Sequence, residues 1–168
     1  MKPPLLRWVF LAAACAVSAA ALAQSSGAPK KEVAGQKTAP ASMRLVTTEG
    51  APKAIGPYSQ AVVEGGFLFA AGQIPLDPKT GEMVTGGIEQ SAERVLDNLE
   101  AVLKAEGLSF SDVVKTTVFL TKAEDFAALN AVYGRRMGDH KPARSTVIVA
   151  ALPRNAPLEI ELIARARR

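Results

Sequence analysis

Two short runs of strand-forming residues that flank Gly65-Gly66 constrain the fold of this chain more than any other feature. The runs are 61–64 (Ala-Val-Val-Glu) and 67–70 (Phe-Leu-Phe-Ala). Glycine adopts positive φ without steric cost, and two such residues in a row form the tight turn that joins antiparallel strands. The sequence therefore predicts a β-hairpin over 61–70, so the fold has to contain an antiparallel sheet.

The hydrophobic period changes to that of a helix after Ile88. Apolar residues recur at helical spacing as far as Leu103, with charged residues between them, and Gly107 follows where a helix commonly stops. A second helix is predicted over 126–137, with Asp125 as its N-cap. Further strands are predicted at 44–48, 113–120, 145–149 and 158–164.

The resulting order of elements is β-β-β-α-β-α-β-β, without an internal repeat. Helices placed among hairpin strands predict an α+β fold, in which a mostly antiparallel sheet carries both helices on one face. The segments 67–71 and 147–149 are apolar at successive positions, so their strands would present apolar side chains on both faces. We therefore expect a homo-oligomer that buries the second face. Burial of these strands within one chain is the alternative.

Residues 1–23 have the pattern of a secretory signal peptide. Lys2 and Arg7 precede an apolar run, and Ala21-Leu22-Ala23 is a small-x-small cleavage pattern before Gln24. The run is shorter than the ~20 apolar residues of a spanning helix, so no stable membrane span is expected after cleavage. A retained anchor, or lipid attachment through Cys15, is the less favoured alternative.

Residues 24–42 are predicted to form a flexible linker, because they are small or polar and include one large aliphatic residue, Val33. The folded domain is then 43–168. Cleavage after Ala23 would leave 145 of the 168 residues and remove the single cysteine and two of the four net positive charges. These features predict an exported, periplasmic protein.

The composition excludes several classes of site. One cysteine and one histidine leave no intrachain disulfide and no Cys/His zinc site, and a catalytic triad would have to use His140. A small positive charge, without basic residues interleaved among aromatic ones, gives no support for nucleic-acid binding.

Four local patterns place reactive side chains in or beside strands. They are centred on Tyr58 in 55–60, Gly72 in 71–75, Arg144 in 142–147, and the alternating carboxylates Glu159 and Glu161. Each also has an ordinary explanation: a packed tyrosine, a bulge, a surface arginine and a half-exposed strand. His140 and Lys115 are predicted to face solvent. These patterns taken one at a time predict a small α+β oligomer and no specific function.

Five motifs in order lead to a more specific interpretation. They are Gly-Pro-Tyr-Ser-Gln (56–60), Ala-Gly-Gln-Ile-Pro (71–75), 112–120, Asn-Ala-Val-Tyr (130–133) and Pro-Ala-Arg-Ser-Thr-Val (142–147). Together they resemble the Rid family, the reactive intermediate deaminases also called the YjgF family, from Met43 to the C-terminus. The resemblance implies a chorismate-mutase-like α+β fold and a homotrimer with active clefts between its subunits. It implies hydrolysis of enamines and imines of the 2-aminoacrylate and 2-iminopropanoate type to 2-keto acids and ammonia, without a metal or organic cofactor.

The resemblance assigns the chemistry to two charged residues. Arg144 matches the arginine that clamps the carboxylate of the 2-imino or 2-keto acid, which suits the two-pronged geometry of a guanidinium. Glu159 matches the acid that positions or deprotonates the attacking water. A protonated imine carbon is already electrophilic, so orientation, a carboxylate contact and an activated water are sufficient for hydrolysis.

The remaining site residues follow from the same resemblance. Tyr58 matches a tyrosine that lines the cleft, Gly72 a backbone contact and Asn130 a polar wall. Thr146 stands where relatives often have cysteine, and its hydroxyl can still bond to the ligand. The stretch 134–138 departs from the family, because many relatives carry aromatic residues there. A non-catalytic periplasmic protein, either a small-carboxylate binder or a holdase-type stress protein, is the alternative function.

Overall fold

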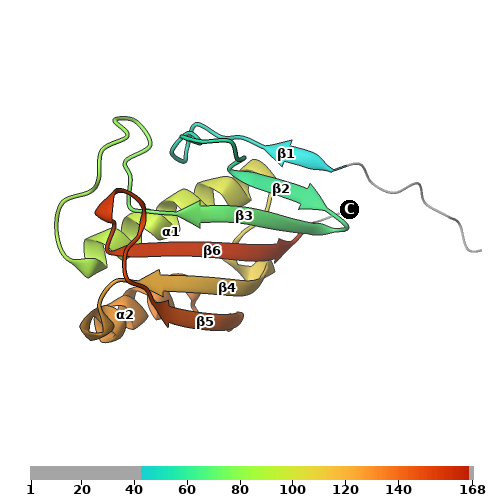
Figure 1. The fold of residues 1–168 in the computed structure, drawn as a ribbon. Coiled ribbons are helices and arrows are strands. Elements are labelled where there is room, and N and C mark those ends of the chain that lie inside the picture. Colours follow the sequence, from blue (N-terminus) through green and yellow to red (C-terminus); the bar gives the residue numbers. More distant parts are fainter. Residues whose placement is uncertain (1–42, 167–168) are drawn as a thin grey trace, which may run out of the picture. The chain divides into compact units, whose positions relative to one another are not determined.

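The structure, a computed structural model, describes residues 43–166. The predicted signal peptide (1–23) and linker (24–42) lie outside these residues, so both remain predictions. The main elements are β1 (Arg44–Val46), β2 (Ala61–Glu64), β3 (Phe67–Gln73), α1 (Ile88–Ala105), β4 (Val113–Leu120), α2 (Phe126–Met137), β5 (Ala143–Ile148) and β6 (Leu158–Arg165) (Figure 1). Their succession confirms the predicted order β-β-β-α-β-α-β-β.

The strands form one six-stranded sheet in the order β1-β2-β3-β6-β4-β5. β2 and β3 are the predicted hairpin: Glu64 pairs with Phe67 around Gly65 and Gly66, whose φ values of 58° and 84° favour glycine. β4 and β5 pair in parallel because α2 crosses over between them, and the other pairings are antiparallel. The sheet is therefore mostly antiparallel, as predicted.

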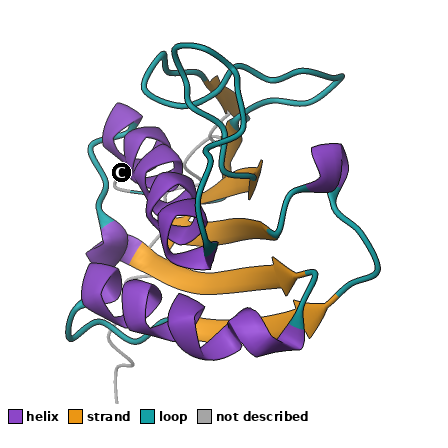
Figure 2. Ribbon diagram, turned by 90° about the vertical axis from the view of Figure 1, so that its left-hand side faces the viewer, coloured by secondary structure: helices purple, strands orange, loops and turns teal. Residues whose placement is uncertain are grey.

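Both helices lie on the same side of the sheet (Figure 2). The core lies between these two layers and includes Leu68, Val118 and Leu162 from the strands and Leu99 from α1, all of them buried. Burial of apolar side chains from both layers stabilises the packing of helix on sheet. This two-layer arrangement confirms the predicted α+β fold class.

Three details differ from the sequence-based prediction. β1 ends at Val46 rather than at residue 48, because the backbone N–H and C=O of Thr48 bond to the side chain of Gln60. β5 begins at Ala143, so Arg144 lies within the strand. Asp125 is the N-cap of α2, but its side chain makes no capping bond. It is the last residue of a 3₁₀ turn (Ala123–Asp125) and has helical φ/ψ, not the extended conformation of a capping residue.

The sheet face that is turned away from the helices carries exposed apolar side chains. Leu68 of β3 points inward, so Phe67 and Phe69 point outward, with 40% and 44% of their surface exposed. Val147 of β5 is 43% exposed on the same face. This confirms that β3 is apolar on both sides, and one protomer leaves an apolar surface uncovered.

Candidate functional site

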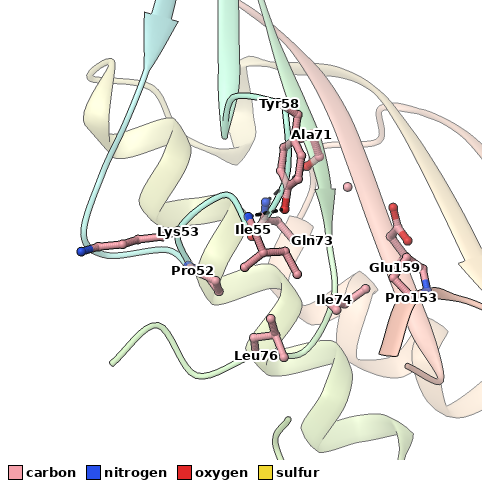
Figure 3. A pocket seen from close by; sticks show the side chains of 11 residues that line it. Pro52, Lys53, Ile55, Tyr58, Ala71, Gln73, Ile74, Leu76, Pro153 and Glu159 are labelled. Atoms are coloured by element: carbon pink, nitrogen blue, oxygen red, sulfur yellow. Dashed lines mark hydrogen bonds between the residues drawn. The ribbon is translucent and has the colours of Figure 1, made fainter. Parts of the chain in front are cut away.

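A cavity of about 300 Å³ lies where β3 and β6 meet the segment between β1 and β2. We call it the Glu159 cavity. Its lining includes Tyr58, Ile55, Ile74, Leu76, Pro153 and Glu159 (Figure 3). The Glu159 carboxylate enters from β6, across the cavity from Tyr58, and the ammonium group of Lys53 points away from it. A single carboxylate therefore faces a largely aliphatic surface.

Gly72 makes room for the Glu159 carboxylate. A Cβ atom at position 72 would lie 1.9 Å from Glu159 Oε1 and 2.7 Å from its Cδ, far inside any permitted contact. Gly72 also lies in the irregular stretch of β3 where the pairing with β6 shifts register. The predicted bulge is therefore present, and the group that approaches the Gly72 backbone is the Glu159 side chain of the same chain.

Burial raises the pKa of Glu159 above its ordinary value, and the negative charge of Glu161 raises it further. Both side chains lie on the same face of β6, two residues apart, as the sequence predicts. Within residues 43–166, no hydrogen-bond donor or cation contacts the Glu159 carboxylate to offset these effects. Glu159 is therefore a carboxylate of increased basicity with free lone pairs.

Tyr58 lies at the rim of this cavity and is not packed in the core. Its side chain is 49% exposed, and its hydroxyl oxygen accepts a hydrogen bond from the Ile55 N–H at 3.3 Å (Figure 3). The Tyr58 N–H donates to the Gly56 carbonyl at 2.9 Å, which tightens the Gly-Pro turn. The structure therefore places an aromatic hydroxyl in the wall of the cavity, across from Glu159.

Arg144 lies in a second cavity, of about 410 Å³, between α2 and β5. Its guanidinium carbon is 4.7 Å from the centre of the Tyr133 ring and 5.8 Å from that of Phe126. Its hydrogen-bond donors contact no carboxylate in the described part of the chain. Aromatic rings thus hold the guanidinium in place and leave its donors available to an anion.

Asn130 and Thr146 lie near Arg144, but in different ways. Asn130 lines the same cavity, and its buried Oδ1 has no hydrogen-bond partner among the described residues. Thr146 is two residues beyond Arg144 on the same face of β5 and is half-buried, but it is not part of the lining of either cavity. Asn130 therefore forms part of the wall of the cavity that holds Arg144, whereas Thr146 does not.

The two charged residues lie on opposite faces of the sheet within one protomer. Arg144 pairs with Thr116, whose buried side chain points towards the helices. Glu159 pairs with Phe119, which alternates with the inward-pointing Val118 and therefore faces the other side. One protomer thus brings Tyr58 and Gly72 to Glu159, and Asn130 to Arg144, but it does not bring these two groups together.

Two residues have a larger part in the Arg144 cavity than the sequence indicates. Tyr133, the last residue of the Asn-Ala-Val-Tyr motif, has its ring 4.7 Å from the Arg144 guanidinium carbon, and its hydroxyl shares a 2.8 Å hydrogen bond with Thr116. His140, predicted to face solvent, is partly buried in this cavity, and its Nε2–H donates to the Val113 carbonyl at 2.6 Å. The spacing of Asn130 and Tyr133, which places both on one helix face, is the sequence signal that could have indicated the role of Tyr133 in this cavity.

Residues 43–166 contain no group of three or more His, Cys, Asp or Glu side chains arranged to hold a metal ion. No helix in this part of the chain is long and apolar enough to cross a membrane. The chemistry that the described residues offer is that of a cation for binding anions and a basic carboxylate in an apolar cavity.

Comparison with known proteins identifies the family. The family model for endoribonuclease L-PSP matches residues 48–166. A RutC family protein of Pyrococcus horikoshii is 53% identical over 120 residues, which is 71% of this chain and 95% of that protein. The chloroplastic Reactive Intermediate Deaminase A of Arabidopsis thaliana is 43% identical over 145 residues, 86% of this chain and 71% of that protein.

A solved structure gives the same result. TdcF of Escherichia coli, crystallised with bound serine, is 42% identical, superposes with a TM-score of 0.70, and is matched over 74% of this chain and 99% of its own. Sequence, fold and motifs therefore agree, and the chain belongs to the Rid family, which the endoribonuclease L-PSP model describes.

Proposed function

We propose that this chain hydrolyses reactive enamine and imine intermediates, of the 2-aminoacrylate and 2-iminopropanoate type, to 2-keto acids and ammonia. The observation that carries the proposal is the presence of two complementary half-sites on one chain. One holds a guanidinium that no carboxylate of residues 43–166 pairs with, over the ring of Tyr133, and the other holds a basic carboxylate in an apolar cavity. Family membership with a reactive intermediate deaminase supports the same chemistry.

The proposal puts the complete site between two copies of the chain. Arg144 and Glu159 lie on opposite faces of one sheet, so a single substrate reaches both only if they come from different subunits. The exposed apolar side chains of β3 and β5 supply a surface that a second copy can cover. Such heterologous contacts can close into a ring in which every subunit gives one half-site to each neighbour, and we propose a ring of three subunits, the homotrimer that the Rid-family resemblance implies.

In this mechanism Arg144 binds the substrate carboxylate through two parallel N–H bonds, and the ring of Tyr133 restricts its orientation. Glu159 accepts a proton from a water molecule while the water oxygen bonds to C2 of the protonated imine and the π electrons move to nitrogen. The resulting carbinolamine takes that proton back on nitrogen. The C–N bond then breaks, ammonia leaves, and the hydroxyl proton passes to Glu159 as the carbonyl forms.

The surroundings of Glu159 suit this role. A general base works best when its pKa approaches the working pH, and burial moves the pKa of Glu159 in that direction. Partial burial of the carboxylate among aliphatic residues lowers the polarity around it, which strengthens its interaction with a cationic imine. The same carboxylate in open solvent would be a weaker base and less strongly coupled to the substrate.

The test is an imine-hydrolysis assay with matched carboxylate variants. An amino-acid oxidase generates 2-iminopropanoate, and its loss is followed by competition with a trapping nucleophile. We expect Glu159→Gln to lower kcat by ~10²–10⁴ with little change in KM. Glu161→Gln, on the same face of β6 but exposed and outside the cavity, is the control: it removes only a charge that raises the pKa of Glu159, so kcat should change far less than in Glu159→Gln.

Two results would reject this function. One is an imine lifetime unchanged by the wild-type protein, and the other is full activity in Arg144→Ala. Retained ligand binding without turnover, insensitive to Glu159→Gln, would instead support a non-catalytic small-carboxylate binder. The stress-protein alternative predicts that neither Arg144→Ala nor Glu159→Gln changes the protein's function.

We also propose that the protein is exported and acts in the periplasm, on the basis of the signal-peptide pattern in residues 1–23. N-terminal sequencing of the protein from the periplasmic fraction tests this. A mature N-terminus at Gln24 is the expected result. Recovery of the whole chain in the cytoplasm, with Met1 at its start, would contradict it.

A further inference from the structure

Gln60 is a buried amide that makes four side-chain hydrogen bonds to one segment of the chain. It precedes β2 and is 3% exposed. Its Oε1 accepts a bond from the Thr48 N–H at 2.6 Å, and its Nε2 donates to the carbonyls of Thr48, Ala51 and Pro52 at 3.0, 3.1 and 2.8 Å. Both ends of the amide are therefore satisfied by residues 48–52.

The segment that Gln60 holds, 47–60, has little else to keep it in place. It contains no helix or strand, and Ala51 is its one buried apolar side chain. Apolar burial this small contributes little stability, whereas each satisfied hydrogen bond of a buried amide is costly to lose. The conformation of the segment is therefore set mainly by one polar side chain.

The same residue also joins this segment to the strand that carries Gly72. The Gln60 carbonyl accepts a hydrogen bond from the Ala71 N–H at 3.0 Å. Ala71 lines the Glu159 cavity, and the segment supplies Tyr58, Ile55 and Pro52 to it (Figure 3). Gln60 itself does not line the cavity, so its effect on the site is transmitted through its neighbours.

We propose that Gln60 is a positioning residue that holds Tyr58 and the wall around it in register with Glu159. This inference rests on the proposed function only where Tyr58 contributes to turnover. The structural part, that Gln60 fixes the segment 47–60 against β3, stands without it. The two parts are tested by separate measurements, so failure of one is distinguishable from failure of the other.

The structural part is tested by residue-resolved amide hydrogen exchange on Gln60→Met, which keeps the side-chain length and removes the four side-chain hydrogen bonds but not the backbone bond to Ala71. We expect the Ala71 and Tyr58 amides to exchange at least about tenfold faster, while Leu99 in α1 changes less than about twofold. Val102→Ala, a truncation buried in α1, is the control and accelerates Leu99 instead. Unchanged exchange at Ala71 and Tyr58 in Gln60→Met would overturn the inference.

The catalytic part is tested by a double-mutant cycle on imine hydrolysis, well below the melting temperature of each variant. If Gln60 acts through Tyr58, Gln60→Met and Tyr58→Phe each lower kcat/KM by roughly tenfold, and the double variant is no worse than either. Losses that multiply would show that Gln60 does not act through Tyr58 and would overturn this part. Gln60→Asn, which keeps the amide but is shorter by one methylene, replaces Gln60→Met if that variant does not fold, with the same expectations.

Discussion

Replacing Gly72 with alanine should displace the carboxylate of Glu159 without unfolding the domain. The new Cβ would lie 1.9 Å from Oε1, whereas real Cβ contacts are essentially never below 3.0 Å, so Oε1 has to move by more than about 1 Å. The atoms in its way are the far end of a flexible side chain, which can rotate. The backbone at Gly72 is outside the left-handed region, so alanine brings no φ penalty of its own.

These values set the size of the two effects. A displacement of about 1 Å at a reacting group costs on the order of 10² in rate, so kcat/KM for imine hydrolysis should fall by ~100-fold. The free energy of unfolding should change by less than about 1 kcal/mol, because rotation of a half-buried carboxylate offsets the gain from a less flexible unfolded chain. Activity and stability should therefore separate.

The measurement compares steady-state kinetics and thermal unfolding of Gly72→Ala in two backgrounds. In Glu159→Ala the colliding carboxylate is absent, so adding Gly72→Ala should lower the residual activity no further and should not destabilise the fold. Full activity of Gly72→Ala in the wild-type background would refute the reasoning. An equal loss in both backgrounds would also refute it, because the effect would then not pass through Glu159.

Three further predictions follow from the same geometry. Glu159→Gln should unfold at a higher temperature than wild type at pH 8. The folded-state pKa of Glu159 is raised, so the stabilisation from its protonated form is present below the ordinary value of 4.5 and is lost as the pH rises through the folded pKa. Calorimetry should show the difference in melting temperature between the two proteins closing at low pH. Arg144→Lys should raise KM by at least about tenfold with a smaller change in kcat, because an ammonium group cannot form the two-pronged contact, and equal kinetics would contradict this. Arg136→Ala should cost about 1–2 kcal/mol in denaturant unfolding without changing kcat, because Arg136 joins three carboxylates of α1 to α2, and a loss unaffected by 1 M salt would contradict this electrostatic origin.

The sequence predicts most of the fold because its signals are local. Gly65-Gly66 fixes the hairpin, and the apolar stripe from Ile88 to Leu103 fixes the first helix and the side of it that packs on the sheet. The end of β1 could not be predicted, because it depends on Gln60, twelve residues beyond Thr48 in the sequence. Side-chain pairing over that distance leaves no periodic pattern in the chain.

The candidate site shows the same division. Alternation along β6 correctly predicts that Glu159 and Glu161 share a face. The alternation does not determine whether Arg144 lies on the same sheet face as Glu159, because that depends on which strands are neighbours. β5 pairs in parallel with β4 at the edge of the sheet, and this pairing turns Arg144 towards α2 and away from Glu159. The separation of Arg144 and Glu159 within one chain therefore follows from the order of strands in the sheet, and the residue types alone do not reveal that order.

The most direct test of the account is to mix subunits that each lack one half-site. Arg144→Ala and Glu159→Gln are each expected to be inactive, and they are unfolded together in equal amounts and refolded. If each site takes Arg144 from one subunit and Glu159 from its neighbour, random assembly leaves about a quarter of the sites intact, so about a quarter of the wild-type imine-hydrolysis rate should return. A mixture as inactive as its two components would contradict the shared site.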